Sequence, residues 1–311
     1  MPQNERLQAN GIELHVEVFG SRSDPVALLV MGNSAPGLVW PDRFCEELAS
    51  AGLCVVRFDA RDTGLSTYID FDTSPYTLDD LAADAFALLD ALAVRSAHVI
   101  GLSQGGVIGY RMALQRPERL RSLTVMMSSA DLRPKNDAFA GVAPRAGELP
   151  RPSADYVAQV IALNASAPVT AEERAQRFVD NFRLAAGPRS PFDEAAWLAL
   201  AHAYAAQVML RTDGLSAKLA NHSHHALAQK RSPNLQADEL ASLRVPVLLI
   251  HGSDDPIFPL EHARWAASVI PGAQLHIVDA MGHALDPAFF APVLGALGSF
   301  YARLDREPAS A

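Results

Sequence analysis

Three residues whose types could do nucleophilic chemistry each follow a short apolar run of the chain. The first is Ser103, which lies in a Gly-x-Ser-x-Gly pattern at residues 101–105. An apolar run precedes this pattern and a helix-like segment follows it, which is the strand–turn–helix order that an exposed nucleophilic serine needs. Glycines allow strand and helix to approach closely at such a turn. The pattern is short and also occurs in ordinary turns, so its meaning depends on partner residues elsewhere in the chain.

Suitable partners follow two later apolar runs. Asp254 and Asp255 come after the run 245–251, and His283 comes after the run 274–278. A serine hydroxyl is a weak nucleophile until an imidazole accepts its proton, and the imidazole needs a carboxylate at its other nitrogen. Because open parallel sheets bind ligands at the carboxyl ends of their strands, we predict that Ser103, His283 and one of the two aspartates meet there.

Apolar runs and amphipathic segments alternate in the order β-β-α-β-α-β-α-β over the first part of the chain, and this alternation returns near the end. It predicts an α/β fold, with a mostly parallel central sheet flanked by helices. The first strand, with an alternating pattern, is expected at a sheet edge. The predicted strands are 12–18, 26–31, 53–58, the run before Ser103, 120–127, 245–251 and 274–278, and the predicted helices are 41–51, 77–92, 107–115, 259–269 and 287–303.

The alternation is interrupted between residues 133 and 232. This segment starts with a stretch rich in proline and glycine and continues with alanine-rich helical patterns at 153–165, 170–186, 192–212 and 214–228. We interpret it as a helical cap inserted over the loop edge of the sheet. The core domain would then consist of residues 1–132 and 233–311.

Composition excludes several classes of function. The 311 residues are 49% hydrophobic and 20% charged, with a formal net charge of −9, so the chain can bury a full core. An acidic chain without basic clusters argues against nucleic acid or an anionic membrane surface as a partner. The first residues are polar and no apolar run is long enough to span a membrane. We expect a cytoplasmic protein in which Cys45 and Cys54 are reduced and fill small apolar spaces.

Other polar residues have simpler interpretations. His222, His224 and His225 lack a nearby carboxylate at helical spacing, so we interpret them as partly solvated surface rather than metal ligands. Arg61 and Asp62 are expected to hold loops together, and His251 is expected to pack against or bond to a neighbouring loop. The sequence contains no glycine-rich phosphate loop, and it predicts neither a metal site nor a cofactor.

Several local motifs together resemble one known family. Over its whole length the chain is similar to the α/β-hydrolases, and among them to the aclacinomycin methylesterase-like serine esterases. The motifs are Val30-Met31-Gly32 with Trp40-Pro41-Asp42, Asp59-x-Arg61-Asp62-Thr63-Gly64-x-Ser66, Gly101-Leu102-Ser103, Asp255-Pro256-Ile257 and Met281-Gly282-His283-Ala284-Leu285.

The resemblance implies roles for particular residues. It places the catalytic acid on Asp255 and leaves Asp254 as a turn former. It implies an oxyanion hole from the backbone N–H groups of Asn33 and Gln104. The side chains at these two positions differ from those of the family, but the contact is made by the backbone.

The resemblance also bears on the substrate. It implies a serine hydrolase that cleaves a carboxylic ester, with a methyl ester on a bulky, polycyclic substrate as the closest example. Gly32, Trp40 and Phe258 are candidates for lining the substrate pocket.

Other functions remain open on the sequence alone. A lactonase, a carbon–carbon hydrolase or a cofactor-free perhydrolase or haloperoxidase would use the same triad. A non-catalytic ligand-binding protein could share the fold, because fold alone does not determine function. The natural substrate and the oligomeric state are not predicted.

Overall fold

A twisted, mostly parallel sheet forms the centre of the protein. A computed structural model describes residues 2–210 and 223–306. Within this part of the chain, eight strands lie in the order β1-β2-β4-β3-β5-β6-β7-β8. The pairs β1–β2 and β2–β4 are antiparallel, and the remaining neighbours are parallel. The strands are β1 Gln3–Ala9, β2 Ile12–Phe19, β3 Val26–Val30, β4 Cys54–Phe58, β5 Ala97–Leu102, β6 Leu120–Met126, β7 Val247–Gly252 and β8 Gln274–Val278.

The sheet confirms the predicted fold class but corrects one of its edges. The sequence predicts that the strand at 12–18 is the edge strand, whereas β1 pairs outside it, with Gln3 opposite Val18 and Ala9 opposite Ile12. Most β1 side chains are polar and exposed, so this strand has little hydrophobic alternation. Its place is instead determined by backbone pairing across the turn at Asn10 and Gly11, both of which have positive φ.

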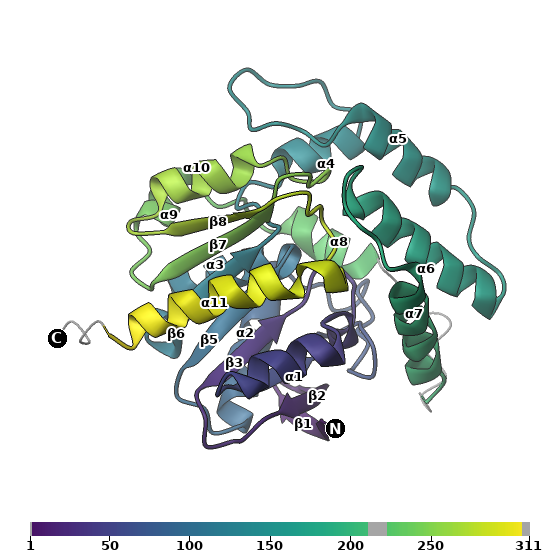
Figure 1. Cartoon of the computed structure of the whole chain (residues 1–311). Coiled ribbons are helices and arrows are strands. Elements are labelled where there is room, and N and C mark those ends of the chain that lie inside the picture. Colours follow the sequence, from purple (N-terminus) through teal and green to yellow (C-terminus); the bar gives the residue numbers. More distant parts are fainter. Residues whose placement is uncertain (1, 211–222, 307–311) are drawn as a thin grey trace.

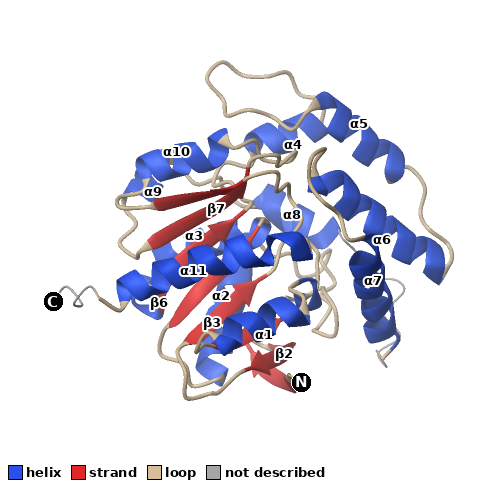
Figure 2. Ribbon diagram, in the orientation of Figure 1, coloured by secondary structure: helices blue, strands red, loops and turns tan. Residues whose placement is uncertain are grey.

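Helices cover both faces of the sheet (Figures 1 and 2). On one face, α1 (Asp42–Ser50) and α11 (Phe290–Leu304) bury side chains such as Phe44 and Phe300 against the strands. On the other face lie α2 (Leu78–Ala91), α3 (Gln104–Gln115), α9 (Ala237–Ala241) and α10 (Glu261–Val269). The described residues also form three short 3-10 turns, η1 (Gly37–Val39), η2 (Pro117–Arg119) and η3 (Pro287–Phe289).

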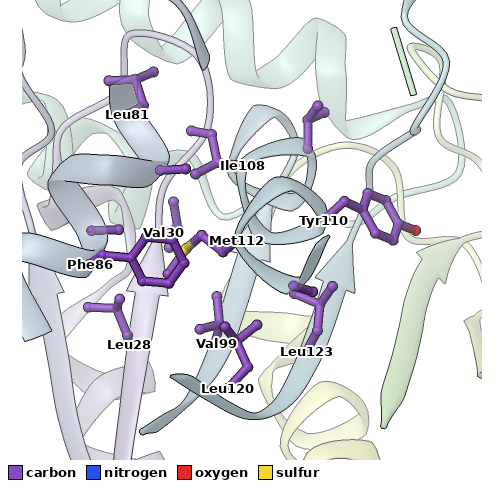
Figure 3. Close-up of a cluster of buried hydrophobic side chains, with 14 of the residues drawn as sticks. Leu28, Val30, Leu81, Phe86, Val99, Ile108, Tyr110, Met112, Leu120 and Leu123 are labelled. Atoms are coloured by element: carbon purple, nitrogen blue, oxygen red, sulfur yellow. The ribbon is translucent and has the colours of Figure 1, made fainter. Parts of the chain in front are cut away.

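The second face has a dense apolar core beneath α3, the helix that follows Ser103. Figure 3 shows Ile108 and Met112 of α3 between Phe86 of α2 and side chains of the strands, among them Val99 of β5. Close packing of this kind makes the helix position sensitive to small changes in volume. The turn between β5 and α3 is therefore held by both elements that it joins. Cys45 and Cys54 are buried free thiols in the two cores, as the sequence predicts.

Helices between residues 133 and 232 lie outside the two covering layers. They are α4 (Arg133–Phe139), α5 (Ala154–Leu163), α6 (Ala171–Ala186), α7 (Glu194–Met209) and α8 (Ser223–Arg231). Figure 1 shows α5, α6 and α7 on the right, beyond the ends of α1 and α11. The sequence pattern does not predict α4, because its proline- and glycine-rich stretch indicates irregular structure. The start of the helix predicted at 214–228 lies outside the described residues.

The local sequence explains where α6 begins. Thr170 accepts a hydrogen bond from the backbone of Glu173, and the Glu173 carboxylate accepts one from the backbone of Thr170. This capping box satisfies two of the first N–H groups of the helix. None of the helices in the described residues is both long enough and apolar enough to cross a membrane.

Candidate active site

Ser103 lies at the sharp turn between β5 and α3, in a strained backbone conformation with φ of 55° and ψ of −121°. Two glycines make the turn possible. A Cβ at Gly101 would lie 2.2 Å from the carbonyl oxygen of Gly105, and a Cβ at Gly105 would lie 2.0 Å from that of Val30. Neither distance is compatible with a side chain. The strain is typical of functional positions, and it exposes the hydroxyl at the carboxyl edge of the sheet.

Residues far apart in the sequence surround this hydroxyl. The Nε2 atom of His283 is 2.9 Å from the Oγ of Ser103, and its Nδ1 is 2.8 Å from the Oδ2 of Asp255. Because the carboxylate accepts a hydrogen bond from Nδ1–H, the proton of the neutral imidazole stays on Nδ1 and Nε2 remains free to accept the serine proton. The three side chains that the sequence predicts to meet are therefore in hydrogen-bond contact.

The carboxylate of Asp255 is buried but remains ionised. Burial acts to raise its pKa, yet the adjacent His283, and to a smaller extent His251 and backbone N–H donors, hold the pKa below its usual value. Its Oδ1 accepts hydrogen bonds at 2.9 Å from the backbones of Ile257 and Phe258. These donors fix the carboxylate plane, so that Oδ2 faces the imidazole. His251 packs as predicted, with Nε2 donating to the carbonyl of Phe258 at 2.7 Å.

The neighbouring carboxylate, Asp254, points to a different partner. It forms an ion pair with Arg189, whose Nε lies 2.8 Å from its Oδ2, at the protein surface. The guanidinium also reaches Asp279 at 3.2 Å. Asp254 therefore joins the loop after α6 to the loops after β7 and β8, and it does not contact His283.

Two backbone N–H groups are candidates for stabilising negative charge beside Ser103. Gln104 is the first residue of α3, where N–H groups have no intrahelical acceptor. Asn33 follows Gly32, and a Cβ at Gly32 would lie 3.1 Å from the Cβ of Ser103, so this loop passes directly beside the serine.

The Gln104 side chain joins this loop to α8. Its Nε2 lies 3.4 Å from the Oδ1 of Asn33 and 3.2 Å from the Oε1 of Gln229. The two amide groups predicted for an oxyanion hole are thus connected through their side chains as well as through the turn.

A cavity of about 540 Å³ opens onto Ser103 and His283. Its core-side wall includes Gly32 and Phe258, both predicted pocket residues. The opposite wall comes from the helical segment, with Tyr156 of α5 and Phe182 of α6. A space of this size accommodates a drug-sized molecule.

Trp40, the third predicted pocket residue, is not among the residues that line this cavity. It is fully buried and stacks on Phe44, with ring centroids 5.6 Å apart. The physical reason is the turn η1: Gly37 packs against the backbone of Phe58, where a Cβ would lie 2.6 Å from its carbonyl oxygen. The chain then continues away from the cavity towards α1.

The sequence patterns do not predict the cavity residues that the helical segment supplies. Besides Tyr156 and Phe182 these include Lys135, Asn136 and Gln229. A helical pattern gives the buried face of a helix, but it does not tell which of its polar residues turn towards a neighbouring loop.

The interpretation of the histidines as partly solvated surface is wrong for two of them. His224 and His225 are buried, because α8 packs inward beside the loop after β4. His225 accepts from the backbone N–H of Ser34 at 3.0 Å and donates to the carbonyl of Arg61 at 2.8 Å. His224 bonds to Asp62 at 3.0 Å, so Arg61 and Asp62 do hold loops together. His222 lies outside the described residues. Over residues 2–210 and 223–306, no group of three or more potential ligands is arranged to hold a metal ion.

The fold and the site define a known class of protein. A family described as the alpha/beta hydrolase fold matches residues 25–285. The chain therefore belongs to the α/β-hydrolase fold family, which confirms the resemblance seen in the motifs.

Two curated relatives are similar over most of their length. The rhodomycin D methylesterase DauP of Streptomyces sp. (strain C5) is 38% identical, and DnrP of Streptomyces peucetius, also a rhodomycin D methylesterase, is 37% identical. Each comparison covers 92% of this chain and 94% of the relative. Among solved structures, a 2-hydroxy-6-oxo-6-phenylhexa-2,4-dienoate hydrolase from Rhodococcus sp. strain RHA1 superposes with a TM-score of 0.72. Its identity is 20%, with 99% of both chains covered, so this match supports the fold alone.

Proposed function

We propose that the protein is a serine hydrolase that cleaves a carboxylic ester, in which Ser103 is the nucleophile, His283 the general base and acid, and Asp255 the orienting carboxylate. The observation that carries the proposal is the continuous hydrogen-bonded path from Asp255 Oδ2 through the imidazole to Ser103 Oγ, with distances of 2.8 and 2.9 Å. The two methylesterase relatives favour an ester over the lactone, carbon–carbon and peroxide chemistries that the sequence left open.

The reaction follows from this geometry. Ser103 Oγ attacks the ester carbonyl while His283 Nε2 takes its proton, and the imidazolium is stabilised by Asp255. The carbonyl oxygen becomes an oxyanion that the N–H groups of Asn33 and Gln104 stabilise, each by about 3 kcal/mol. His283 then protonates the leaving alcohol as the carbon–oxygen bond breaks, which leaves Ser103 acylated. A water molecule deprotonated by His283 attacks the acyl-enzyme, and the proton returns to Ser103 as the acid leaves.

The substrate in this proposal is a methyl ester of a bulky acid. Methanol is small, so the cavity of about 540 Å³ is available for the acyl part. Residues 133–232 act as a cap domain on the core formed by 1–132 and 233–311. The cavity supports this division, because one wall comes from the core loops and the other from α4, α5, α6 and α8.

A cytoplasmic location and the absence of a nucleic acid partner belong to the same proposal. Two cysteines that remain free thiols and a net charge of −9 support them. Fractionation of the native host, with the protein detected in the membrane-free lysate, tests the location.

The direct test of function is hydrolysis of nitrophenyl and aromatic methyl esters by the purified protein and by Ser103→Ala. We expect the variant to fold normally and to lose about 10⁴- to 10⁶-fold in kcat. Labelling of the wild-type protein at Ser103 by a fluorophosphonate, detected by mass spectrometry, would identify the nucleophile. Equal ester hydrolysis by the variant would contradict the proposal.

A further inference from the structure

A lysine from the helical segment faces the cavity that holds the proposed nucleophile. Lys135 lies in α4 and is half-buried, and it lines the same cavity as Ser103 and His283. Its Nζ is 5.8 Å from the ring centroid of Phe258, and that ring lies 5.6 Å from the ring of His283. The ring of Phe258 therefore neighbours both the ammonium group and the imidazole, and all three groups line one cavity.

This ammonium group has no carboxylate partner in the described part of the chain. The acidic residues nearest to it in sequence are already paired: Asp131 with Arg133 at 2.7 Å and Asp137 with Arg145 at 2.9 Å. Among the described residues that line the cavity there is no aspartate or glutamate. A second lysine, Lys230, lies exposed on the same lining. The cavity is thus locally cationic, although the chain as a whole carries a net charge of −9.

Such an arrangement is unfavourable without a ligand. A cation partly removed from water without a counter-ion loses solvation, and the aromatic face of Phe258 replaces some of it. Burial accordingly lowers the pKa of Lys135 to about 8. An anion placed beside Nζ would supply the missing charge and the missing acceptor together. Charge-assisted hydrogen bonds in a dry site are among the stronger ones that proteins make.

We infer that the substrate carries, on its acyl part and in addition to the ester, an ionised oxygen acid that Lys135 binds. This inference rests on the proposed ester hydrolysis, because methanol as the leaving group makes the acyl part the occupant of the cavity. The chemical class is a methyl ester whose acyl part bears a carboxylate or an acidic phenol.

A pair of substrates that differ in one charge tests the inference. Monomethyl terephthalate is anionic, and dimethyl terephthalate is its neutral counterpart. We expect Lys135→Met to lower kcat/KM for the monomethyl ester by about 10- to 100-fold more than for the dimethyl ester, the range of one charge-assisted hydrogen bond. Lys230→Met makes the same chemical change at an exposed position, and there we expect a differential effect below about threefold.

The outcomes separate the two proposals. If the wild-type protein hydrolyses both esters and Lys135→Met affects them equally, the inference is overturned while the esterase function stands. An equal differential effect in Lys230→Met would also overturn it, since general electrostatic attraction would then replace binding by Lys135. Failure of the wild-type protein to hydrolyse either ester overturns the proposed function and the inference with it.

The source of the negative charge is resolved by a third substrate. A methyl hydroxynitrobenzoate, whose phenol is ionised at neutral pH, replaces the carboxylate by a phenolate. Selective loss of its turnover in Lys135→Met supports a phenolate ligand, and selective loss for the terephthalate alone supports a carboxylate. A melting curve recorded for each variant confirms that the comparison is made on folded protein.

Discussion

The backbone N–H of His283 donates a hydrogen bond to the carbonyl oxygen of Ala185 at 2.7 Å. Ala185 lies in the last turn of α6, within the helical segment, whereas His283 lies in the loop after β8 of the core. The loop is thus held on one side by Asp255 through the imidazole and on the other side by α6 through the backbone. The helical segment does more than enclose the cavity, because it fixes the position of the imidazole that activates Ser103.

Gly282→Ala should disturb this contact and reduce activity. A Cβ at Gly282 would lie 1.9 Å from the carbonyl oxygen of Ala186 and 2.7 Å from that of Ala185, so the loop and α6 must separate. A shift of about 1 Å at His283 lowers kcat/KM by roughly 100-fold, because the proton transfer depends on geometry. Hydrolysis of a nitrophenyl ester measures the loss.

Gly298→Ala in α11 is the matched control for this substitution. No atom lies within 4 Å of a Cβ built at that residue, so we expect wild-type activity and a slightly raised melting temperature. Wild-type kcat/KM in Gly282→Ala would show that the contact with α6 does not position His283.

Asp255→Asn should lower kcat by about 10³- to 10⁴-fold. The amide cannot stabilise the imidazolium, and its NH₂ group would favour the tautomer of His283 that cannot accept the serine proton. The adjacent Asp254→Asn provides the control, because Asp254 pairs with Arg189 at the surface. We expect that variant to stay within about fivefold of the wild-type kcat. Similar losses in both variants would mean that Asp255 acts only through loop structure.

The triad could be predicted from the sequence because each of its residues is attached to the end of a strand. Strand ends in a parallel sheet are brought to one edge by the topology itself, so Ser103, Asp255 and His283 meet whatever the loops between them do. Gln104 follows in the same way because it begins the helix after the serine, whereas the choice of Asn33, in the loop after β3, required the family resemblance. The choice of Asp255 over Asp254 required the family resemblance.

The other features of the site could not be predicted from the sequence. They depend on how helices and loops pack against one another, which local sequence patterns do not specify. His224 and His225 look like surface residues until α8 is placed beside the loop after β4. Trp40 looks like a pocket residue until η1 turns the chain towards α1. Lys135 lies in a stretch that reads as irregular, and only the helix α4 turns it towards the cavity.

Arg61→Met should destabilise the protein strongly. The guanidinium makes two hydrogen bonds of 2.6 Å to Asp84, and both side chains are nearly inaccessible to solvent. Removal of one partner leaves a buried, uncompensated carboxylate, which costs about 3 to 5 kcal/mol of unfolding free energy. Urea unfolding followed by circular dichroism measures this loss. Arg43→Met breaks the exposed pair with Glu47 and should cost less than about 0.5 kcal/mol, and equal losses in the two variants would contradict the argument.

Stability should fall as the pH is lowered from about 6.5 towards 4. Burial lowers the pKa of four histidines, His98, His225, His251 and His262. For His98 the value reaches about 4, with Arg121 adding to the lowering and Asp305 opposing it. A histidine that is neutral when folded but titrates near pH 6.5 when unfolded takes up protons preferentially in the unfolded state. The stabilisation that such a neutral histidine contributes to the folded state is therefore complete above pH 6.5 and is lost progressively below it.

The size of this effect can be checked at one residue. Between pH 7 and pH 5.5 the preferential protonation of His98 in the unfolded state should cost the wild-type protein about 1 kcal/mol of unfolding free energy. His98 lies beside Ser122 and the Tyr301 ring, and His98→Leu removes this titrating group. Over the same pH range the variant should therefore lose about 1 kcal/mol less unfolding free energy than the wild-type protein. The exposed His202 offers the comparison, and His202→Leu should keep the wild-type pH dependence. Urea unfolding at both pH values measures this difference. If His98→Leu loses as much unfolding free energy as the wild-type protein, burial does not keep His98 neutral in the folded state.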